Sequence, residues 1–425
     1  MRKKEENLNT ASGLRIAMIL LGIAVTPVLL SSSSLGNQLS SGSLISVVLL
    51  GGVILTLLSA ITISVGEKAR LPTYGIVKYS FGEKGAIAIN ILMAISLFGW
   101  IAVTANMFGH SVHDLLAQHG LEVPLALLVA AGCVIFVAST AFGFAVLGKI
   151  AQVAVPVIAL VLCYILYVAT HTEVAVPAAI VEMNTGVAVS TVVGTIIVLV
   201  ATLPDFGSFV HNRKHALIAA GVTFLVAYPL LYWAGATPSA ISGQGSLLGA
   251  MAVFGAVLPA ALLLIFACVT GNAGNMFQGT LVVSTLLTRF PKWQITVALG
   301  ILSAIVGSMD IMAWFIPFLL FLGIATPPVA GIYIADFFLY RRNGYQESVL
   351  AQESQIKVLT FAAWIGWLYD RKRLIHPDDD PFGRLDSGGM YRVCDSQSGK
   401  STPLIPGYTQ AMITAESGEI QPLYH

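Results

Sequence analysis

A tryptophan stands in the middle of a long apolar stretch, where its ring could recognise a flat solute. Trp100 lies away from the membrane interfaces that tryptophan usually favours. An indole that faces a cavity can stack on a planar heterocycle, which adds about 0.5–1.5 kcal/mol to the burial of its area. Ser96 and Thr104 lie one helical turn away on the same face. Core packing is the alternative role for this ring.

Two carboxamides lie three residues apart in another apolar stretch. Asn272 and Asn275 share one face of a helix, and each can donate and accept hydrogen bonds. Such a pair suits the donor–acceptor edge of a nucleobase. The alternative is a hydrogen-bonded clamp between helices, which is common in membrane bundles.

Acidic residues inside membrane spans are candidates for function by default. Asp205 and Asp310 stand near span ends, and Asp336 lies inside a span end. Basic residues follow two of them: His211, Arg213 and Lys214 after Asp205, and Arg341 and Arg342 after Asp336. We therefore predict structural pairing for both.

No enzymatic signature accompanies these residues. The eight histidines are scattered, and none stands at metal-ligand spacing from a cysteine or glutamate. The chain has no Walker A, G-x-S-x-G or H-E-x-x-H motif, so neither an enzyme nor an ATP-driven pump is supported. We expect no cofactor and no nucleic-acid partner.

These side chains must be positioned by structural elements, and the composition of the chain indicates that those elements are membrane helices. Hydrophobic residues make up 56% of the chain and charged ones 10%, with a mean hydropathy of +0.83. A soluble domain carries roughly a quarter charged residues, so we predict an all-α integral membrane protein in the lipid bilayer. Ten apolar runs are long enough to span it: 14–35, 44–66, 86–109, 122–142, 148–169, 187–208, 216–237, 248–287 (over-long, so bent or extended), 293–309 and 312–339.

The basic residues alternate from one connection to the next. Lysine and arginine occur in the N-terminal tail and the even-numbered connections, whereas the odd-numbered connections 36–43, 110–121, 170–186 and 238–247 have none. The positive-inside rule therefore predicts a multi-pass protein of the inner (plasma) membrane with a cytoplasmic N-terminus.

Two of the spans contain helix breakers. Pro27 precedes a run of serines in the first, and the segment 202–207 interrupts the sixth. Five spans separate them, so they enter the membrane from opposite sides, which is typical of a transporter site between inverted repeats. Simple kinks in packed helices are the alternative. The polar segment 66–85 predicts a structured inner loop with a short amphipathic helix at 73–80.

The chain accordingly divides into four parts. Residues 1–13 form a cytoplasmic tail and 14–342 the ten-helix transporter core. Residues 343–369 form a cytoplasmic link and a truncated eleventh-helix stub, whose apolar part at 357–369 is too short to span. The polar residues 370–425 predict a disordered cytoplasmic tail.

Five ordered segments of this chain resemble the nucleobase–cation symporter family, the permeases for cytosine, purines, uracil, allantoin and hydantoin. The segment from Pro327-Pro328 to Asp336, followed by Arg341-Arg342, is the most specific match. The other four are 66–85, 98–100, 205–214 and 270–277.

The resemblance implies a five-plus-five inverted-repeat bundle of the leucine-transporter type, with broken first and sixth helices. It also implies alternating access coupled to Na⁺ or H⁺, and import of a small planar heterocycle. The implied cation contacts are Thr26, Leu29, Ala267, Thr270 and Gly271. The solute contacts that we assign on this basis are Trp100, Thr104, Ser31, Val198, Asn272 and Asn275.

Three features depart from the family pattern. Thr270-Gly271 stands where cytosine permeases have consecutive threonines, and 196–200 carries no aromatic residue. Family members have twelve spans, and this chain has ten and a stub. A non-transporting membrane sensor on the same scaffold and an inactive truncated permease are the alternative functions. The solute, the coupling ion and the oligomeric state stay open at this point.

Overall fold

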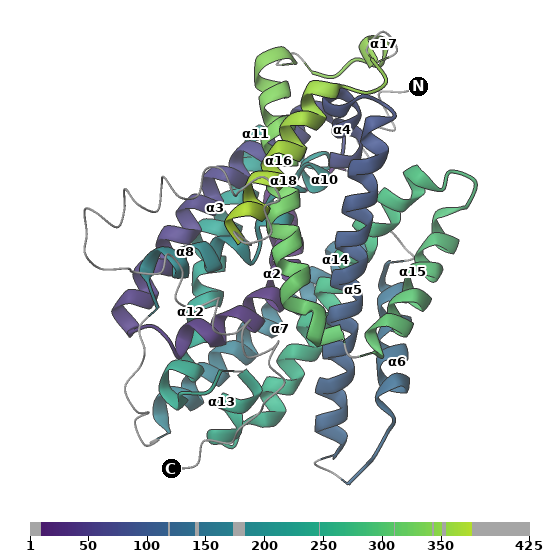
Figure 1. Cartoon of the computed structure of the whole chain (residues 1–425). Helices are drawn as coiled ribbons and strands as arrows, with labels where there is room; N and C mark the ends of the chain where they lie inside the picture. Colours follow the sequence, from purple (N-terminus) through teal and green to yellow (C-terminus); the bar gives the residue numbers. More distant parts are fainter. Residues whose placement is uncertain are drawn as a thin grey trace. The chain divides into compact units, whose positions relative to one another are not determined.

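The computed structural model describes residues 10–117, 120–140, 144–172, 183–245, 247–309, 311–341, 344–350 and 354–375 (Figure 1). The chain divides into two compact units, Met1–Gly366 and Trp367–His425, and the ten predicted spans belong to the first. These described residues are helical apart from turns, short connections and one isolated bridge between Ala11 and Val210.

Each predicted apolar run coincides with one helix or with consecutive helices. The first five are α2 (Gly13–Gly36), α3 (Ser41–Ala69), α5 (Gly85–Ala117), α6 (Leu125–Thr140) and α7 (Phe144–His171). The next five comprise α8 (Thr185–Gly194), α9 (Ile197–Ala201) and α10 (Pro204–Gly207); α11 (Arg213–Ala220), the π-helix η1 (Gly221–Ala227) and α12 (Tyr228–Ser242); α13 (Leu247–Val253) and α14 (Val257–Leu286); α15 (Lys292–Gly307); and the 3₁₀ turn η2 (Ile311–Trp314) with α16 (Phe315–Tyr340).

Six helices among the described residues are long and apolar enough to cross a membrane unaided. The over-long eighth run is bent, as predicted. Gly255 adopts a left-handed φ of +67° between α13 and α14, which a residue with a side chain rarely tolerates.

The two spans with breakers differ from each other. The sixth is divided into α8, α9 and α10, with non-helical backbone at Ile196 and Thr202. The first is a continuous helix with Pro27 inside it, so the expected break in the first helix is not seen. Proline removes only one backbone donor from the ladder, and the Ser31 hydroxyl donates to the Pro27 carbonyl at 2.9 Å.

Small residues bring the central helices together. α14 packs along α5 and against α2 and α7, and α2 also packs against α12. A Cβ atom added at Gly274 would lie 2.3 Å from Ile23 Cγ1, so only glycine allows α2 and α14 to approach this closely. Their shared surface forms part of the cavity described below.

The predicted short helix in the inner loop is present as α4 (Thr73–Phe81). Further along the chain, α17 spans Glu347–Leu350 and α18 spans Val358–Ile375. The helix α18 therefore continues six residues beyond the predicted stub, because charged residues that end an apolar run can still be good helix formers. The rest of the predicted tail, 376–425, lies outside the described residues, as do residues 1–9.

Candidate functional site

A cavity lies among α2, α5, α14 and the divided sixth span. The empty space within its lining, with its opening included, is about 480 Å³. The fourteen lining residues are Ile23, Thr26, Pro27, Leu97, Trp100, Thr104, Thr195, Ile196, Val198, Leu199, Thr202, Gly271, Asn275 and Gln278. None of these fourteen carries a charge, so the cavity favours a neutral solute.

Trp100 is half-buried and forms one wall of the cavity. Its ring is held edge-on by Phe315 and Phe318 of α16, at centroid distances of 6.0 and 6.1 Å. Edge-to-face packing fixes the plane of the indole. The ring therefore borders the cavity in a defined orientation, which is what a stacking platform requires.

The two predicted carboxamides of α14 have different surroundings. Asn272 is fully buried, and its side-chain oxygen lies 2.5 Å from the Thr104 hydroxyl while its nitrogen donates to the Ile101 carbonyl at 3.4 Å. Asn275 is half-buried and lines the cavity, and its carboxamide has no hydrogen bond to any residue that the structure describes. Asn272 thus clamps α14 to α5, and Asn275 faces the space where a solute can bind.

Thr104 and Val198 line the cavity, but Ser31 does not. The Ser31 hydroxyl accepts a hydrogen bond from Tyr232 of α12 at 3.0 Å. The Thr104 hydroxyl can also donate to the Trp100 carbonyl at 2.6 Å. Of the six solute contacts assigned from the sequence, the structure therefore brings Trp100, Thr104, Val198 and Asn275 together around one space.

The predicted cation contacts lie where α2 meets α14. Thr26 is fully buried, and its hydroxyl has no hydrogen-bond partner among the described residues. A Cβ atom added at Gly271 would lie 3.1 Å from that hydroxyl oxygen, so the two residues are direct neighbours. Thr270 donates instead to the carbonyls of Phe266 and Ala267, each at 3.0 Å. Leu29 and Ala267 are buried outside the cavity lining.

Sequence reasoning missed Gln278. It follows Asn275 by three residues, the same spacing that separates Asn272 from Asn275, so extension of the polar series along α14 by one turn would have found it. Thr195 and Thr202 were also missed as lining residues, because the side chains that a broken helix presents depend on where its backbone turns.

Asp205 lies beside this cavity, at the start of α10, and is 2% exposed. Its oxygens accept from the Thr73 backbone N–H at 2.7 Å and from Gln278 Nε2 at 2.8 Å. No basic side chain in the described part of the chain pairs with it, so the predicted pairing with His211, Arg213 or Lys214 is wrong. The carboxylate faces the N-terminus of α4 instead, because the chain turns between α10 and α11.

The other acidic predictions have separate outcomes. Asp336 pairs with Arg341 at 3.0 Å and accepts from Ser80 at 3.1 Å, so its structural pairing is confirmed. Burial, with the nearby Asp336 carboxylate, raises the pKa of Tyr345 well above its usual value. Asp310 and Arg342 lie outside the described residues.

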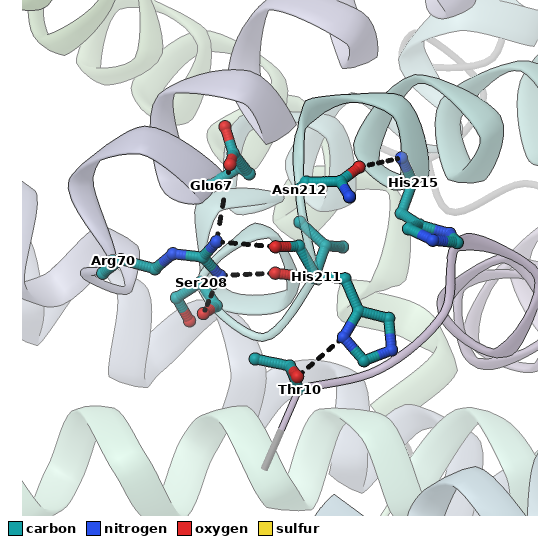
Figure 2. Close-up of polar contacts among 8 residues, drawn as sticks. Thr10, Glu67, Arg70, Ser208, His211, Asn212 and His215 are labelled. Atoms are coloured by element: carbon teal, nitrogen blue, oxygen red, sulfur yellow. Dashed lines mark hydrogen bonds and ion pairs between the residues drawn. The ribbon is translucent and has the colours of Figure 1, made fainter. Parts of the chain in front are cut away.

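A second polar group joins the start of α2 to the end of α3 and the segment after α10 (Figure 2). We call it the inner-end cluster because the sequence predicts that these segments lie on the cytoplasmic side. Arg70 donates to the carbonyls of Val210 and His211, the latter at 3.0 Å, and reaches Glu67 at 3.4 Å. The Thr10 hydroxyl lies 2.7 Å from His211 Nδ1. These hydrogen bonds join three segments of the chain at one end of the bundle.

The backbone of α2 is part of this cluster. The N–H of Gly13, its first residue, donates to His215 Nδ1 at 3.0 Å. Asn212, whose side chain accepts from the His215 N–H at 3.2 Å, caps α11 (Figure 2).

An uncharged cavity inside a bundle of apolar helices is what a multi-pass membrane transporter of a neutral solute requires, and comparison with known proteins shows that class. Residues 3–367 match the family described as permeases for cytosine/purines, uracil, thiamine and allantoin. The chain belongs to this family, and the predictions of a permease and against an enzyme are confirmed. The cytosine permease of Escherichia coli (strain K12) is 28% identical over 342 residues, which are 78% of each protein.

Two solved structures establish the fold. One is Mhp1, a nucleobase-cation-symport-1 family transporter, in a closed conformation with bromovinylhydantoin bound. It has a TM-score of 0.71 at 17% identity and covers 87% of this chain and 92% of its own. The other is the inward-facing conformation of Mhp1. It has a TM-score of 0.67 at 18% identity and covers 85% of this chain and 89% of its own. The predicted leucine-transporter-type bundle is confirmed.

Proposed function

We propose that this chain imports a neutral nucleobase or similar planar heterocycle, of the cytosine, purine or pyrimidine-precursor class, by cation-coupled alternating access. The observation that carries this proposal is the cavity, in which the Trp100 ring and the unpaired Asn275 carboxamide share uncharged walls. An aromatic face and a donor–acceptor amide are the two kinds of contact that a flat heterocycle needs. The names of the cytosine permease and of the hydantoin-bound Mhp1 agree with this solute class.

The coupling ion in this proposal is Na⁺ or H⁺, held between α2 and α14. The supporting observation is the buried Thr26 hydroxyl, which has no partner among the described residues and lies against Gly271. A buried hydroxyl without a hydrogen bond is costly, so a ligand beside it would satisfy a group that the protein leaves unpaired. Leu29, Ala267 and Thr270 complete the proposed cation region.

We further propose that the protein lies in the inner (plasma) membrane with its N-terminus in the cytoplasm. The supporting observation is that three segments rich in lysine and arginine meet at one end of the bundle: the N-terminal tail, the connection after α3 and the start of α11. The inner-end cluster joins them, because Thr10 and Arg70 both contact His211, two residues before Arg213. A fluorescent reporter that folds only in the cytoplasm, fused ahead of Met1, tests this orientation. Loss of fluorescence with normal insertion would contradict it.

Uptake into proteoliposomes tests the transport proposal. Purified protein is reconstituted and supplied with radiolabelled bases under an imposed Na⁺ gradient, an imposed H⁺ gradient or neither. Accumulation above the external concentration under one gradient supports import and names the ion. Binding without accumulation would identify the sensor alternative, and neither binding nor uptake would identify an inactive truncated permease.

A further inference from the structure

We propose that Asp205 orients the Gln278 carboxamide so that its oxygen faces the solute cavity, and that the site therefore selects a heterocycle that presents an N–H there. Gln278 is then a specificity-determining residue and Asp205 a positioning residue. This inference rests on the proposed transport function and adds which hydrogen-bonding group the solute must present at one edge of its ring.

The geometry places Gln278 between the cavity and a buried carboxylate. Gln278 lines the cavity and is 1% exposed to the outside of the protein. Its Nε2 lies 2.8 Å from Asp205 Oδ2 and 3.4 Å from the Thr202 hydroxyl oxygen. Both hydrogens of the amide nitrogen are thus directed toward two residues of the sixth span.

Two features favour this orientation of the amide. An ionised carboxylate can only accept hydrogen bonds, so the Gln278 nitrogen and not its oxygen must face Asp205. The Thr202 hydroxyl donates its single hydrogen to the carbonyl of Val198 at 3.1 Å or of Leu199 at 3.2 Å. With its hydrogen on one of these carbonyls, the hydroxyl accepts from Gln278. A reversed amide would meet acceptors at both contacts.

Donors in the fold offset part of the cost of burying a charge at Asp205. The Thr73 N–H that donates to Asp205 Oδ1 at 2.7 Å belongs to the first residue of the nine-residue helix α4. The positive end of a helix dipole favours a carboxylate there. The position is fixed by close packing, since a Cβ atom at Gly66 of α3 would lie 2.4 Å from Pro204 Cα.

The remaining hydrogen-bonding capacity of Gln278 is its oxygen, to which no described residue donates. Asn275, one turn earlier on the same face, can donate or accept. A matching solute is therefore neutral and places an N–H at Gln278 beside a second polar group at Asn275. Nucleobases differ in where along an edge they carry a donor or an acceptor, so a fixed acceptor discriminates among them.

Asp205→Asn is the first test. In this variant the oxygen of the new side-chain amide stays with the Thr73 N–H, so its nitrogen donates toward Gln278 and draws the Gln278 oxygen away from the cavity. The probes are cytosine and uracil, and adenine and hypoxanthine, because the members of each pair exchange a donor and an acceptor on one edge. The ratio of dissociation constants within a pair, measured by scintillation proximity on purified protein, should change by about tenfold or more.

The double variant Asp205→Asn with Gln278→Glu should restore the wild-type ratio to within about threefold, because a carboxylate at position 278 again presents only an acceptor. A purely structural role for Asp205 does not predict such a rescue. Gln278→Met, which removes the acceptor at similar size, should weaken the preferred base about tenfold. The matched control is Asn90→Leu, which removes another buried amide between α5 and α14, bonded to Thr285 at 3.4 Å outside the cavity, and should leave the ratio unchanged.

The outcomes separate this inference from the transport proposal. If the wild type binds bases but neither Asp205→Asn nor Gln278→Met alters the ratio or the affinity, the inference is overturned and the transport proposal stands. If Asp205→Asn fails to fold, Gln278→Met alone decides the role of the acceptor. If the wild type binds none of the four bases, this inference is overturned, whereas uptake of another planar heterocycle would leave the transport proposal standing.

Discussion

The solute cavity and the inner-end cluster differ in whether their polar groups have hydrogen-bond partners. In the cavity, the Asn275 carboxamide and the Thr26 hydroxyl have no partner among the described residues, although both are at least half-buried. In the inner-end cluster, Arg70, His211 and His215 bind backbone or side-chain groups from other segments. In the cavity this unused hydrogen-bonding capacity is available to a ligand, whereas in the cluster the capacity is used to join segments of the chain.

The energetic reason is the cost of an unpaired buried group. Leaving a buried donor or acceptor without a partner costs about 1–3 kcal/mol, whereas a formed bond contributes about 0.5–1.5 kcal/mol. A fold keeps such a group where a ligand later satisfies it. Substitutions in the cavity should therefore change affinity, and substitutions in the cluster should change the rate of opening.

The largest effect on affinity is expected for Trp100→Ala. Loss of the stacking face and of its buried area should weaken solute binding at least about tenfold, which corresponds to about 1.4 kcal/mol. Equilibrium binding of the best base on purified protein measures it. Trp293→Ala at the start of α15, where the side chain is 61% exposed, is the matched control and should bind normally. Unchanged affinity in Trp100→Ala would return this ring to core packing.

Asn275→Ala and Asn272→Ala should separate recognition from packing on a single helix. Asn275→Ala should lower affinity about fivefold to tenfold with an unchanged melting temperature, because it removes a solute contact. Asn272→Ala should lower the melting temperature, because it breaks the clamp between α14 and α5. Binding and thermal unfolding, measured on both variants, check the pair. The distinction fails if both variants lose affinity equally at equal stability.

Arg70→Ala tests the inner-end cluster. It frees the carbonyls of Val210 and His211, so the inner end should open more readily, with solute affinity kept within about twofold and the transport rate altered about threefold. Initial uptake rates in proteoliposomes measure the effect. Arg289→Ala, an exposed arginine after α14, is the control. A large loss of affinity without a change in rate would mean that Arg70 supports the cavity and not the closure.

The smallest effect is expected for Gly271→Ser. It places a second hydroxyl beside Thr26, but its Cβ would lie 3.1 Å from the Thr26 oxygen, so Thr26 must shift slightly. If Na⁺ binds there, the Na⁺ concentration for half-maximal uptake should fall about twofold to threefold, because the added hydroxyl supplies one more oxygen ligand. Gly271→Ala, which adds the Cβ without the hydroxyl, is the control. Steep Na⁺ stimulation already present in the wild type would count against a missing ligand.

Much of the architecture was predictable from the sequence, because bilayer length and charge placement act on each segment separately. All ten apolar runs coincide with helices, the bend in the eighth run and the helix at 73–80 were expected, and Asp336 pairs with Arg341 as spacing suggested. The family resemblance, carried by ordered local motifs, is likewise a property of the sequence. Trp100 could be singled out from the sequence because tryptophan is unusual in the middle of a membrane span.

Only the tertiary structure decided which polar side chains share a space. Asn272 and Asn275 are identical in type and lie one turn apart, yet Asn272 binds α5 and Asn275 lines the cavity. Asp205 faces Thr73 and Gln278, from segments far away in the chain, and not the basic residues that follow it. The physical reason is that a hydrogen bond depends on distances of a few tenths of an ångström between packed helices, whereas hydropathy and periodicity describe each helix by itself.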